Sequence, residues 1–418
     1  MPDSTAPTDA QDTAAEPSGY RALLSTPAVR RWLLVSLLAK LPVAMAPLAL
    51  VFLVRESPGG YTLGAFLGGA YVVGEVVGAP VLGARLRGGR QRVQLAIGLA
   101  VGAAAFAGLA FCASAPAALP TVLAFVAGAA PAANSGSLRA ALVEIVPKED
   151  VTRALSVETT LTQGIWAVAP ALVAFLALGG AAGAPLGLAA ACAVLAAVGV
   201  RLLPIGRVPR DEAQVSEGPK PSLVRALAVG WPIYLTSAAA MALLATAELV
   251  LPALLQYRGL PVGWSGPLLT VFSASSVAGG LLYGARAWPG DSRRQSLVLL
   301  VVMAVFVGMI VVLPGLGGIA VGLVLAGAFK SGVMVTRNLS LRSWVPPDML
   351  ATGYSVMYAV QGVGYSMTAS IAALVLANTS PPAAIVSGTV LTLLLTFVSA
   401  LVERRKKEGK KKEKRTTL

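Results

Sequence analysis

Twelve apolar runs follow one another along the chain, and they constrain its fold more than any other feature. A helix of about 20 residues, rising 1.5 Å per residue, crosses the roughly 30 Å apolar core of a bilayer. A helix also pairs its own backbone amides, which would each cost several kcal/mol if left unpaired in hydrocarbon. Each run is therefore predicted to be a transmembrane helix. The runs lie at 32–54, 61–83, 93–113, 118–138, 155–178, 184–203, 229–256, 263–284, 295–316, 317–340, 351–378 and 382–402.

The composition agrees with a polytopic membrane protein and excludes a soluble globular domain. Of the 418 residues, 56% are hydrophobic and only 12% are charged, which is unlike an ordinary soluble domain. Residues 1–20 lack the basic and then apolar order of a secretory leader, so they are predicted to form a disordered tail. Cys112 and Cys192 both fall inside apolar runs, where a disulfide framework is not expected.

The distribution of Lys and Arg predicts which side of the membrane each loop faces. If both termini are cytoplasmic, nearly all of the 33 Lys and Arg residues fall in the tails and loops of that side. Only Arg55 and Arg258 are left on the other side, while Lys40 and Lys330 lie within runs. This asymmetry follows the positive-inside rule. It predicts a multi-pass protein of the cell inner membrane or plasma membrane with both termini in the cytoplasm.

The two halves of the chain repeat the same landmarks about 200 residues apart. Gly83-Ala84-Arg85 is matched by Gly284-Ala285-Arg286, and Ser156-Val157 by Ser355-Val356. Each half holds six runs, so the two have the same orientation and are related by an axis along the membrane normal. The predicted fold is all-α, with twelve transmembrane helices in two parallel six-helix repeats. The predicted units are a disordered N-terminal tail (1–20), an N-terminal six-helix bundle (21–203), a cytoplasmic linker (204–221), a C-terminal six-helix bundle (222–403) and a basic cytoplasmic tail (404–418).

The segment after the second run carries a motif of a known family. In that family a glycine is followed, after three residues, by an aspartate, a basic residue, one further residue, a glycine and more basic residues. The sequence Gly83-Ala84-Arg85-Leu86-Arg87-Gly88-Gly89-Arg90-Gln91-Arg92 fits if one residue is deleted. With this motif and its repeat, the chain resembles the major facilitator superfamily of secondary transporters. The motif positions are Gly83, Arg85, Arg87, Gly89, Arg90 and Arg92.

The resemblance covers nearly all of the chain outside the two tails. It implies a transporter rather than an enzyme, working by rocking of two halves. The aspartate that helps to latch the halves at the cytoplasmic face of family members is missing here, so a latch of that kind is not expected. The stretch 138–147 looks like the family's loop after helix 4. Drug-proton antiporters of the family carry Gly-Pro and Gly-Gly in helix 5, where this chain has Ala169-Pro170 and Val173-Ala174.

Four ionisable residues are assigned to the interior of the runs: Lys40, Glu75, Glu248 and Lys330. Such groups cost about 2.5–3.5 kcal/mol on insertion scales and usually face a cavity or a partner. Lys40 and Glu75 are both placed roughly 12–14 Å from the cytoplasmic end, so the two could pair. Protonating Glu75 would then release Lys40 and couple a proton to a conformational step, whereas a static ion pair is the equal alternative. Glu75, Lys40 and Glu248 are the candidates for proton coupling.

Polar and aromatic side chains at helical spacing form stripes in the runs 155–178 and 351–378. Such stripes suit a cavity that binds an amphipathic or aromatic molecule. Packing between helices is the alternative for each single residue. Lys330 is added because its ammonium would attract an anionic substrate or a partner acid, with packing against helix dipoles as the equal alternative. The candidates for the substrate cavity are Lys330, Thr159, Gln163, Trp166, Tyr354, Tyr358, Gln361 and Tyr365.

Several kinds of chemistry are absent from the sequence. It has no histidine, no paired cysteine motif and no carboxylate cluster with metal spacing, so neither a metal site nor a cofactor nor His-based catalysis is expected. It has no GxxxxGK[ST] motif, so hydrolysis of ATP by a P-loop is not expected. Energy for transport would then come from an ion gradient or from the substrate's own gradient. Glu75 and Glu248 are the acids predicted to lie deep enough to carry a proton.

The resulting prediction is proton-coupled export of a small amphipathic organic compound by alternating access. Proton-coupled uptake of a small metabolite is one alternative. A sensor or scaffold that does not transport is another, suggested by the missing aspartate. The expected partners are a small-molecule substrate, protons and the lipid bilayer. The basic tail either binds anionic lipid or only anchors the topology, and no nucleic acid is expected because no aromatic residue interrupts its charges.

Overall fold

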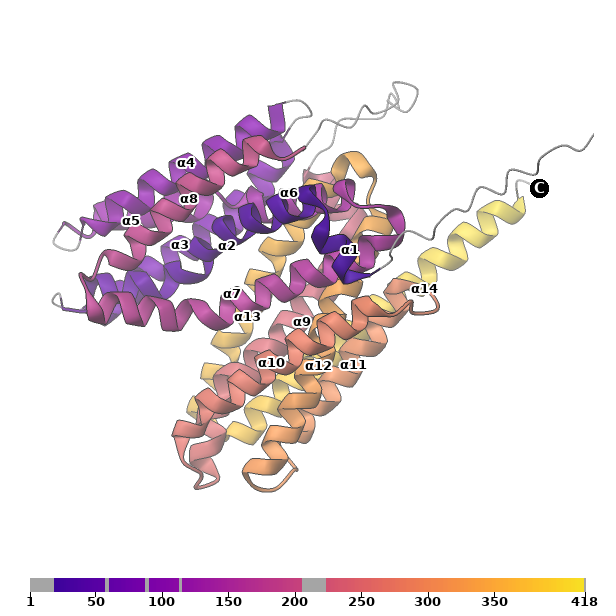
Figure 1. Ribbon diagram of the computed structural model, residues 1–418. Coiled ribbons are helices and arrows are strands. Elements are labelled where there is room, and N and C mark those ends of the chain that lie inside the picture. Colours follow the sequence, from indigo (N-terminus) through magenta and orange to yellow (C-terminus); the bar gives the residue numbers. More distant parts are fainter. Residues whose placement is uncertain (1–18, 57–59, 87–89, 113–114, 205–222, 417–418) are drawn as a thin grey trace, which may run out of the picture.

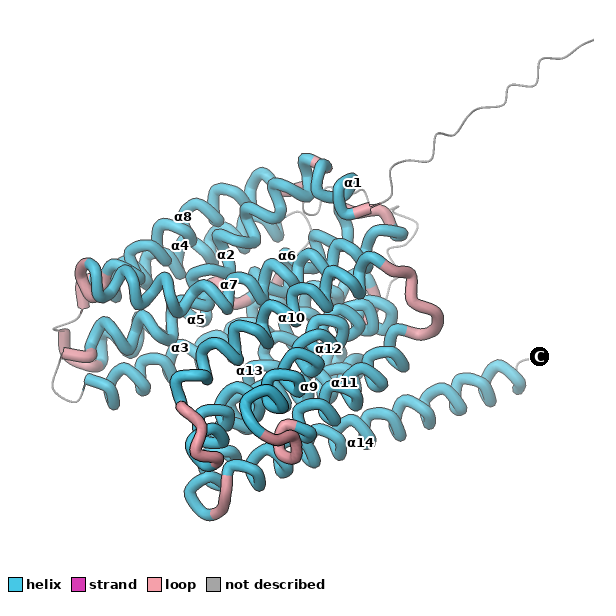
Figure 2. The backbone as a smooth tube through the Cα atoms, turned by 60° about the horizontal axis from the view of Figure 1, so that its bottom comes forward, coloured by secondary structure: helices cyan, strands magenta, loops and turns pink. Residues whose placement is uncertain are grey.

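Every regular element in the described part of the chain is a helix (Figures 1 and 2). The computed structural model describes residues 19–56, 60–86, 90–112, 115–204 and 223–416. Within these ranges, twelve spans are long and apolar enough to cross a membrane. The predicted all-α fold with twelve transmembrane helices in two repeats is confirmed.

Two halves of six spans each follow one another in the chain. The N-half consists of a short leading helix α1 (Tyr20–Ser25) and then α2 (Pro27–Val54), α3 (Gly60–Arg85), α4 (Gln91–Ala110), α5 (Ala118–Ala129), α6 (Ala133–Ile145), α7 (Val151–Gly179) and α8 (Ala184–Leu202). The C-half consists of α9 (Leu223–Tyr257), α10 (Ser265–Ala285), α11 (Ser292–Met309), α12 (Gly315–Trp344), α13 (Leu350–Asn378) and α14 (Pro381–Thr416). Short 3-10 turns at Lys148–Asp150, Val262–Trp264 and Pro347–Met349 precede α7, α10 and α13.

The fourth span is broken, whereas its counterpart in the C-half is not. α5 ends at Ala129 and α6 begins at Ala133, with Pro131 in the turn between them. A proline inside a helix removes one backbone hydrogen bond and clashes with the preceding turn, which accounts for the break. α6 then continues to Ile145, beyond the predicted end of the run at 138. The counterpart α12 is continuous over 30 residues.

The ends of the helices differ in charge. We call the end where α2, α4, α7, α9, α11 and α13 begin the basic end, because arginines cluster there, among them Arg90, Arg153 and Arg294. Arg55 and Arg258 lie at the opposite end. α14 runs past its spanning part at 381–402 as one helix. The predicted linker 204–221 lies almost wholly outside the described residues, as do residues 1–18 and the side chains of the basic tail.

Three apolar clusters show how the two halves meet. The first, which we call the shared core, joins the basic ends of both halves and includes Trp32 and Leu155 of the N-half with Val335 and Tyr354 of the C-half. A second cluster is confined to α2 to α5, α7 and α8, and a third to α9 to α14. The halves therefore share a core at the basic end. Toward the opposite end their cores are separate, and Figure 1 shows the two sets of helices diverging there.

Two matching glycines allow the halves to approach closely at the basic end. A Cβ on Gly83 of α3 would stand 2.7 Å from the Cβ and Oγ of Ser355 on α13, so a larger residue does not fit there without movement. A Cβ on Gly284 of α10 would likewise collide with Ser156 of α7. These are the glycines and serines that the sequence repeat pairs. The repeat thus places one Gly–Ser contact on each side of the junction between the halves.

Candidate functional site

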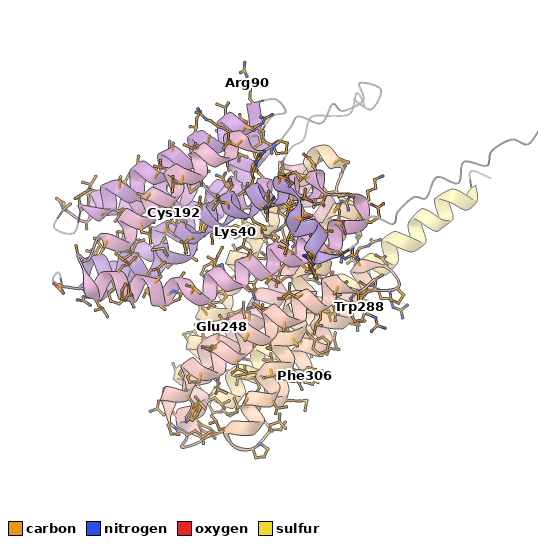
Figure 3. All side chains as sticks on the ribbon, in the orientation of Figure 1. Lys40, Arg90, Cys192, Glu248, Trp288 and Phe306 are labelled. Carbon is orange, nitrogen blue, oxygen red and sulfur yellow. The ribbon has the colours of Figure 1, made fainter. Side chains whose placement is uncertain are left out.

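Lys40 pairs with Glu158 and not with Glu75, so the predicted Lys40–Glu75 pair is wrong. The Lys40 ammonium donates to Glu158 Oε1 and, at 2.7 Å, to Thr162 Oγ1. Arg139 donates to the same Glu158 oxygen at 2.8 Å. These three charged residues, here called the N-half triad, come from α2, α6 and α7. Figure 3 labels Lys40 within the N-half.

The N-half triad is buried, and the sequence prediction missed two of its three members. Lys40 and Arg139 are each 8% exposed and Glu158 is 1% exposed. Glu158 could have been identified from the sequence, because it falls in the run 155–178. It was placed too near the end of that run, since the run begins one turn later than the helix. α7 starts at Val151, which places Glu158 about 10 Å inside. Arg139 was missed because its run was expected to end one residue earlier, whereas α6 carries it into the interior.

Glu75 forms a hydrogen bond across the two halves instead. Tyr358 of α13 donates its phenolic hydrogen to Glu75 Oε1 on α3 at 2.8 Å. Arg139 lies close enough to Tyr358 to interact electrostatically with it. The Glu75–Tyr358 bond is therefore next to the N-half triad. Glu75 and Lys40 belong to one polar region, connected through Tyr358, Arg139 and Glu158 rather than by a direct contact.

A second hydrogen bond crosses between the halves on the other helix pair. Gln163 of α7 donates to Ser276 Oγ of α10 at 3.2 Å, and Ser276 is hydrogen-bonded to Ser331 of α12 at 2.8 Å. α7 and α10 are the counterparts of α13 and α3 in the repeat. These two hydrogen bonds each join side chains of opposite halves, but one involves an ionisable acid and the other joins neutral groups.

Lys330 and Glu248 lie near one another in the C-half without forming an ion pair within 4 Å among the described residues. Their charges interact over a longer distance. The Lys330 ammonium lies 4.9 Å from the centre of the Phe272 ring, and Tyr365 donates to Glu248 Oε2 at 3.4 Å. Gly327, one turn before Lys330, has no Cβ to collide with Phe272 and so lets α10 and α12 approach. The structure brings these predicted residues together.

The other predicted cavity residues divide between burial and exposure. Tyr354 is fully buried in the shared core, donates to the Asn338 carbonyl at 3.0 Å and lies beneath the Arg139 guanidinium. Thr159 is buried, and its hydroxyl has no hydrogen-bond partner among the described residues. Gln361 contacts the Met334 sulfur at 3.8 Å. Trp166 is exposed, so it does not join the buried residues of its stripe.

The loop motif contributes its glycine to the junction between the halves and leaves its described arginines at the surface. The Gly83 carbonyl accepts a hydrogen bond from Thr352 of α13 at 3.0 Å. Arg85 and Arg90 are exposed, and Arg92 is partly buried. Arg87 and Gly89 lie outside the described residues. The motif therefore joins the halves through α3 backbone and Thr352, at the place where the family uses its aspartate.

The leading helix α1 adds one more contact at the basic end. Tyr20 donates its hydroxyl to the Leu281 carbonyl of α10 at 2.7 Å. Burial raises the pKa of the Tyr20 phenol, which therefore keeps its proton and remains a donor at neutral pH. Tyr20 also stands against Gly284, beside the Gly284–Ser156 contact. This contact ties the start of the N-half to the C-half.

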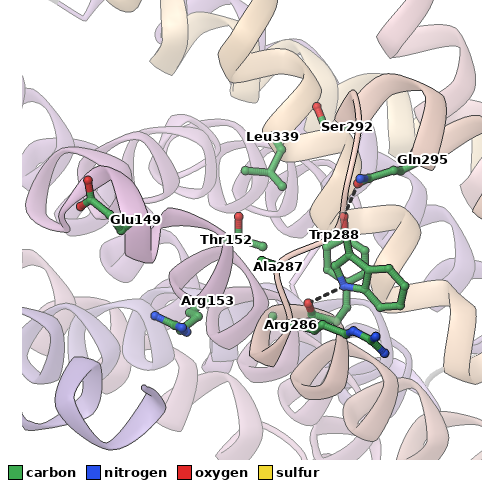
Figure 4. A pocket seen from close by; sticks show the side chains of 12 residues that line it. Glu149, Thr152, Arg153, Arg286, Ala287, Trp288, Ser292, Gln295 and Leu339 are labelled. Carbon is green, nitrogen blue, oxygen red and sulfur yellow. Dashed lines mark hydrogen bonds between the residues drawn. The ribbon is translucent and has the colours of Figure 1, made fainter. Parts of the chain in front are cut away.

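A cavity of about 290 Å³ opens at the basic end between the start of α7 and the α10–α11 connection (Figure 4). Trp288 stacks on Tyr283 with ring centres 5.5 Å apart, and Gln295 accepts a hydrogen bond from the Tyr283 hydroxyl at 2.7 Å. Arg153 lines the opposite wall and pairs with Asp150. None of the predicted substrate or proton residues lines this cavity.

Spanning helices in two matching halves, joined at one end and bearing buried charges where they meet, define a membrane transporter of the secondary class. The family model of the Major Facilitator Superfamily matches residues 32–317 and 268–417, and the chain belongs to that family. A search of curated proteins finds no match.

Solved structures of this family share the fold. A bacterial homologue of the iron transporter ferroportin in its outward-facing state superimposes with a TM-score of 0.72 at 14% identity, over 90% of this chain and 99% of that one. FucP in the outward conformation gives 0.68 at 14% identity, over 90% and 99%. The human organic anion transporter MFSD10 gives 0.67 at 17% identity, over 89% and 98%. At these identities the likeness concerns the fold alone.

Proposed function

We propose that the protein exports a small amphipathic organic compound in exchange for protons, with Glu75 as the group that carries the proton. The observation that carries this proposal is the hydrogen bond from Tyr358 to Glu75, because it places an ionisable acid on the junction between the halves. The proposal also places the basic end at the cytoplasm of the cell inner membrane or plasma membrane, in accord with the positive-inside rule.

With that orientation, the arrangement of the cores fits an outward-facing conformation. The shared core closes the cytoplasmic end, and the separate cores leave the outer parts of the halves free to part. Two of the similar solved structures, those of the ferroportin homologue and FucP, are in an outward-facing or outward conformation. The next step of an alternating-access cycle must then open the basic end and close the outer one.

Protonation of Glu75 provides a physical reason for that step. A hydrogen bond from a phenol to a carboxylate is charge-assisted and roughly twice as strong as one between neutral groups. A proton that reaches Glu75 from outside removes the charge and weakens the bond to Tyr358. The remaining bond between the halves at this depth, Gln163 to Ser276, is neutral and does not change. The basic end then opens more readily, and the proton is carried inward.

The same inward step would serve a symporter, so uptake remains the alternative. Among the similar structures, the titles of XylE and FucP describe proton symporters for xylose and fucose. We favour export for this chain because the predicted cavity residues are aromatic and amide side chains together with few charges, which suit an amphipathic molecule more than a sugar. Binding of anionic lipid by the basic tail is a separate proposal that depends on residues 404–415 alone.

Inside-out membrane vesicles with an acidic interior separate these functions. For an exporter, adding a substrate to the outside drives its accumulation, and the exchange releases protons that a pH-sensitive dye reports. The probes are rhodamine 6G, ethidium and naphthalene-2-sulfonate, which differ in charge but are all amphipathic. We expect at least one to accumulate and to discharge the proton gradient. Glu75→Gln should abolish this gradient-driven flux while leaving exchange of substrate for substrate.

The controls decide among the alternatives. Vesicles without the protein give the background, and Tyr358→Phe, which keeps the acid, should retain coupled flux with altered rate. Expulsion of a preloaded probe by the acidic interior would support uptake instead. Flux of a probe that is unchanged in Glu75→Gln would contradict the role of Glu75. Absence of protein-dependent flux for every probe would favour a sensor or scaffold.

A further inference from the structure

We propose that Lys330 binds the anionic group of the substrate, so that the transported class is an amphipathic organic anion such as a carboxylate or sulfonate. This inference rests on the proposed transport function and specifies its substrate. It depends on the surroundings of the Lys330 ammonium, on its depth in the bundle and on a contrast with Lys40. Each of these is a feature of the described residues.

Lys330 is a buried cation whose bonding is incomplete. Its side chain is 5% exposed, and the ammonium makes no hydrogen bond and no ion pair with the described residues. Its close neighbour is the face of the Phe272 ring, which attracts a cation but accepts no conventional hydrogen bond. An ammonium has three donors to satisfy, and an unmet charge in the membrane interior is costly. A ligand that supplies an anionic oxygen would meet this need.

Lys40 shows how the same side chain is treated when its role is structural. Its ammonium donates to Glu158 and Thr162, and the pair is completed by Arg139. Both lysines are almost fully buried, so burial does not distinguish them. The difference is that Lys40 has a carboxylate within bonding distance, whereas Glu248 interacts with Lys330 only at longer range. Lys330 is therefore the one of the two that is available to a ligand.

Lys330 lies near the middle of α12, deeper than two members of the N-half triad. It stands 14 residues before the end of α12, or about 21 Å from the basic end. Glu248 is nine residues from the far end of α9, and Figure 3 places it in the C-half, away from the shared end. The N-half triad, by contrast, has Arg139 and Glu158 about 10 Å from the basic end, beneath the shared core. A ligand that enters from the opposite end would therefore meet Lys330 before it met Arg139 or Glu158.

The neighbouring groups favour an anion with an apolar body. The Phe272 ring offers an apolar face, and Tyr365 and Gln361 on α13 offer a ring and an amide one turn apart. Glu248 repels a second negative charge and attracts Lys330, so it competes with the ligand for the ammonium. A single anionic group on an aromatic or aliphatic body fits these surroundings better than a dianion or a cation does.

Three probes of matched shape test the charge preference: naphthalene-2-sulfonate, naphthalene-2-sulfonamide and 2-naphthylmethylammonium. Their affinities for the purified full-length protein in detergent are measured by isothermal titration, which requires no flux. We expect the sulfonate to bind at least about tenfold more tightly than the other two, since a charged hydrogen bond contributes that much. Lys330→Gln should remove the preference, and Lys330→Arg should keep most of it.

Glu248→Gln gives a second readout that does not depend on the lysine variants folding. Removing the competing acid should raise the affinity for the sulfonate several-fold and leave the sulfonamide unchanged. Equal affinities for the three probes, no detectable sulfonate binding, or a preference that survives in Lys330→Gln would overturn the proposal. Because binding is measured without transport, these outcomes differ from a failure of the proposed function, in which the sulfonate binds through Lys330 but no protein-dependent flux occurs.

Discussion

The two halves share a repeat but handle their buried charges differently. In the N-half, Lys40, Arg139 and Glu158 are joined by short ionic hydrogen bonds. In the C-half, Lys330 and Glu248 interact only at longer range and form no ion pair within 4 Å among the described residues. The difference indicates a division of labour. The N-half uses its charges to hold helices together, and the C-half keeps Lys330 available to a ligand.

Removing the Glu158 carboxylate should have the largest effect on stability, because it leaves the two buried cations of the N-half without their anion. Glu158→Gln leaves Lys40 and Arg139 buried and facing one another without an anion, which should cost about 3–5 kcal/mol. The melting temperature of the purified protein in detergent measures the loss. Glu248→Gln is the matched control in the C-half, because Lys330 is not bonded to that acid. Equal loss of stability in the two variants would show that the halves treat their charges alike.

The next largest effect concerns the two hydrogen bonds that join side chains of opposite halves. Tyr358→Phe removes a bond to an acid and should shift the balance toward an open basic end by about 1.5–3 kcal/mol. Gln163→Leu removes a bond between neutral groups and should shift it by only about 0.5–1.5 kcal/mol. Alkylation of a single cysteine placed at Thr152, in a variant without Cys112 and Cys192, reports opening. A larger effect from Gln163→Leu would reverse the assigned roles.

A steric test addresses the glycine contacts at the same junction. Gly83→Val forces a side chain against Ser355. This overpacking should destabilise the state with a closed basic end by about 1–3 kcal/mol relative to the open state. Gly69→Val on the same helix has no atom within 4 Å of its Cβ and serves as the control for helix propensity. The Thr152 cysteine again reports opening. Similar labelling of both variants would mean that the Gly83 contact does not close the basic end.

The smallest effect is expected at α1. Tyr20→Phe removes the hydrogen bond to the Leu281 carbonyl but keeps the ring, so it should weaken closure by about 1 kcal/mol. In Tyr20→Phe, the Thr152 cysteine should be alkylated slightly faster than in the protein with Tyr20 and more slowly than in Tyr358→Phe. If the Thr152 cysteine were alkylated faster in Tyr20→Phe than in Tyr358→Phe, the α1 contact would contribute more to closure of the basic end than the Glu75–Tyr358 bond.

Sequence patterns were sufficient for the fold because hydrophobic length and charge asymmetry are properties of a chain in a bilayer. They also indicated which glycines and serines correspond between the repeats. They did not show that Gly83 meets Ser355 and that Gly284 meets Ser156. A repeat shows which positions of the two halves are equivalent, and it does not show which positions are in contact.

Pairing of the buried charges could not be predicted for a different reason. Depth alone placed Lys40 level with Glu75, but depth says nothing about which face of a helix a residue occupies. Glu158 was overlooked because the apolar run begins later than α7, whose first turn is polar. Pro131 was visible in the sequence, yet the extension of α6 to Ile145, which buries Arg139, depends on packing against α13 and α3.

Loss of charge at Glu75 is expected to open the basic end and to close the opposite end. Electron–electron distance measurements between spin labels test it, with one pair at Ala118 and Gly263 on the outer ends and another at Glu149 and Arg294 on the basic end. In Glu75→Gln, and in the unmodified protein as the pH is lowered, we predict a shorter outer distance and a longer basic-end distance. Distances that are the same in Glu75→Gln and the unmodified protein at every pH would contradict the account.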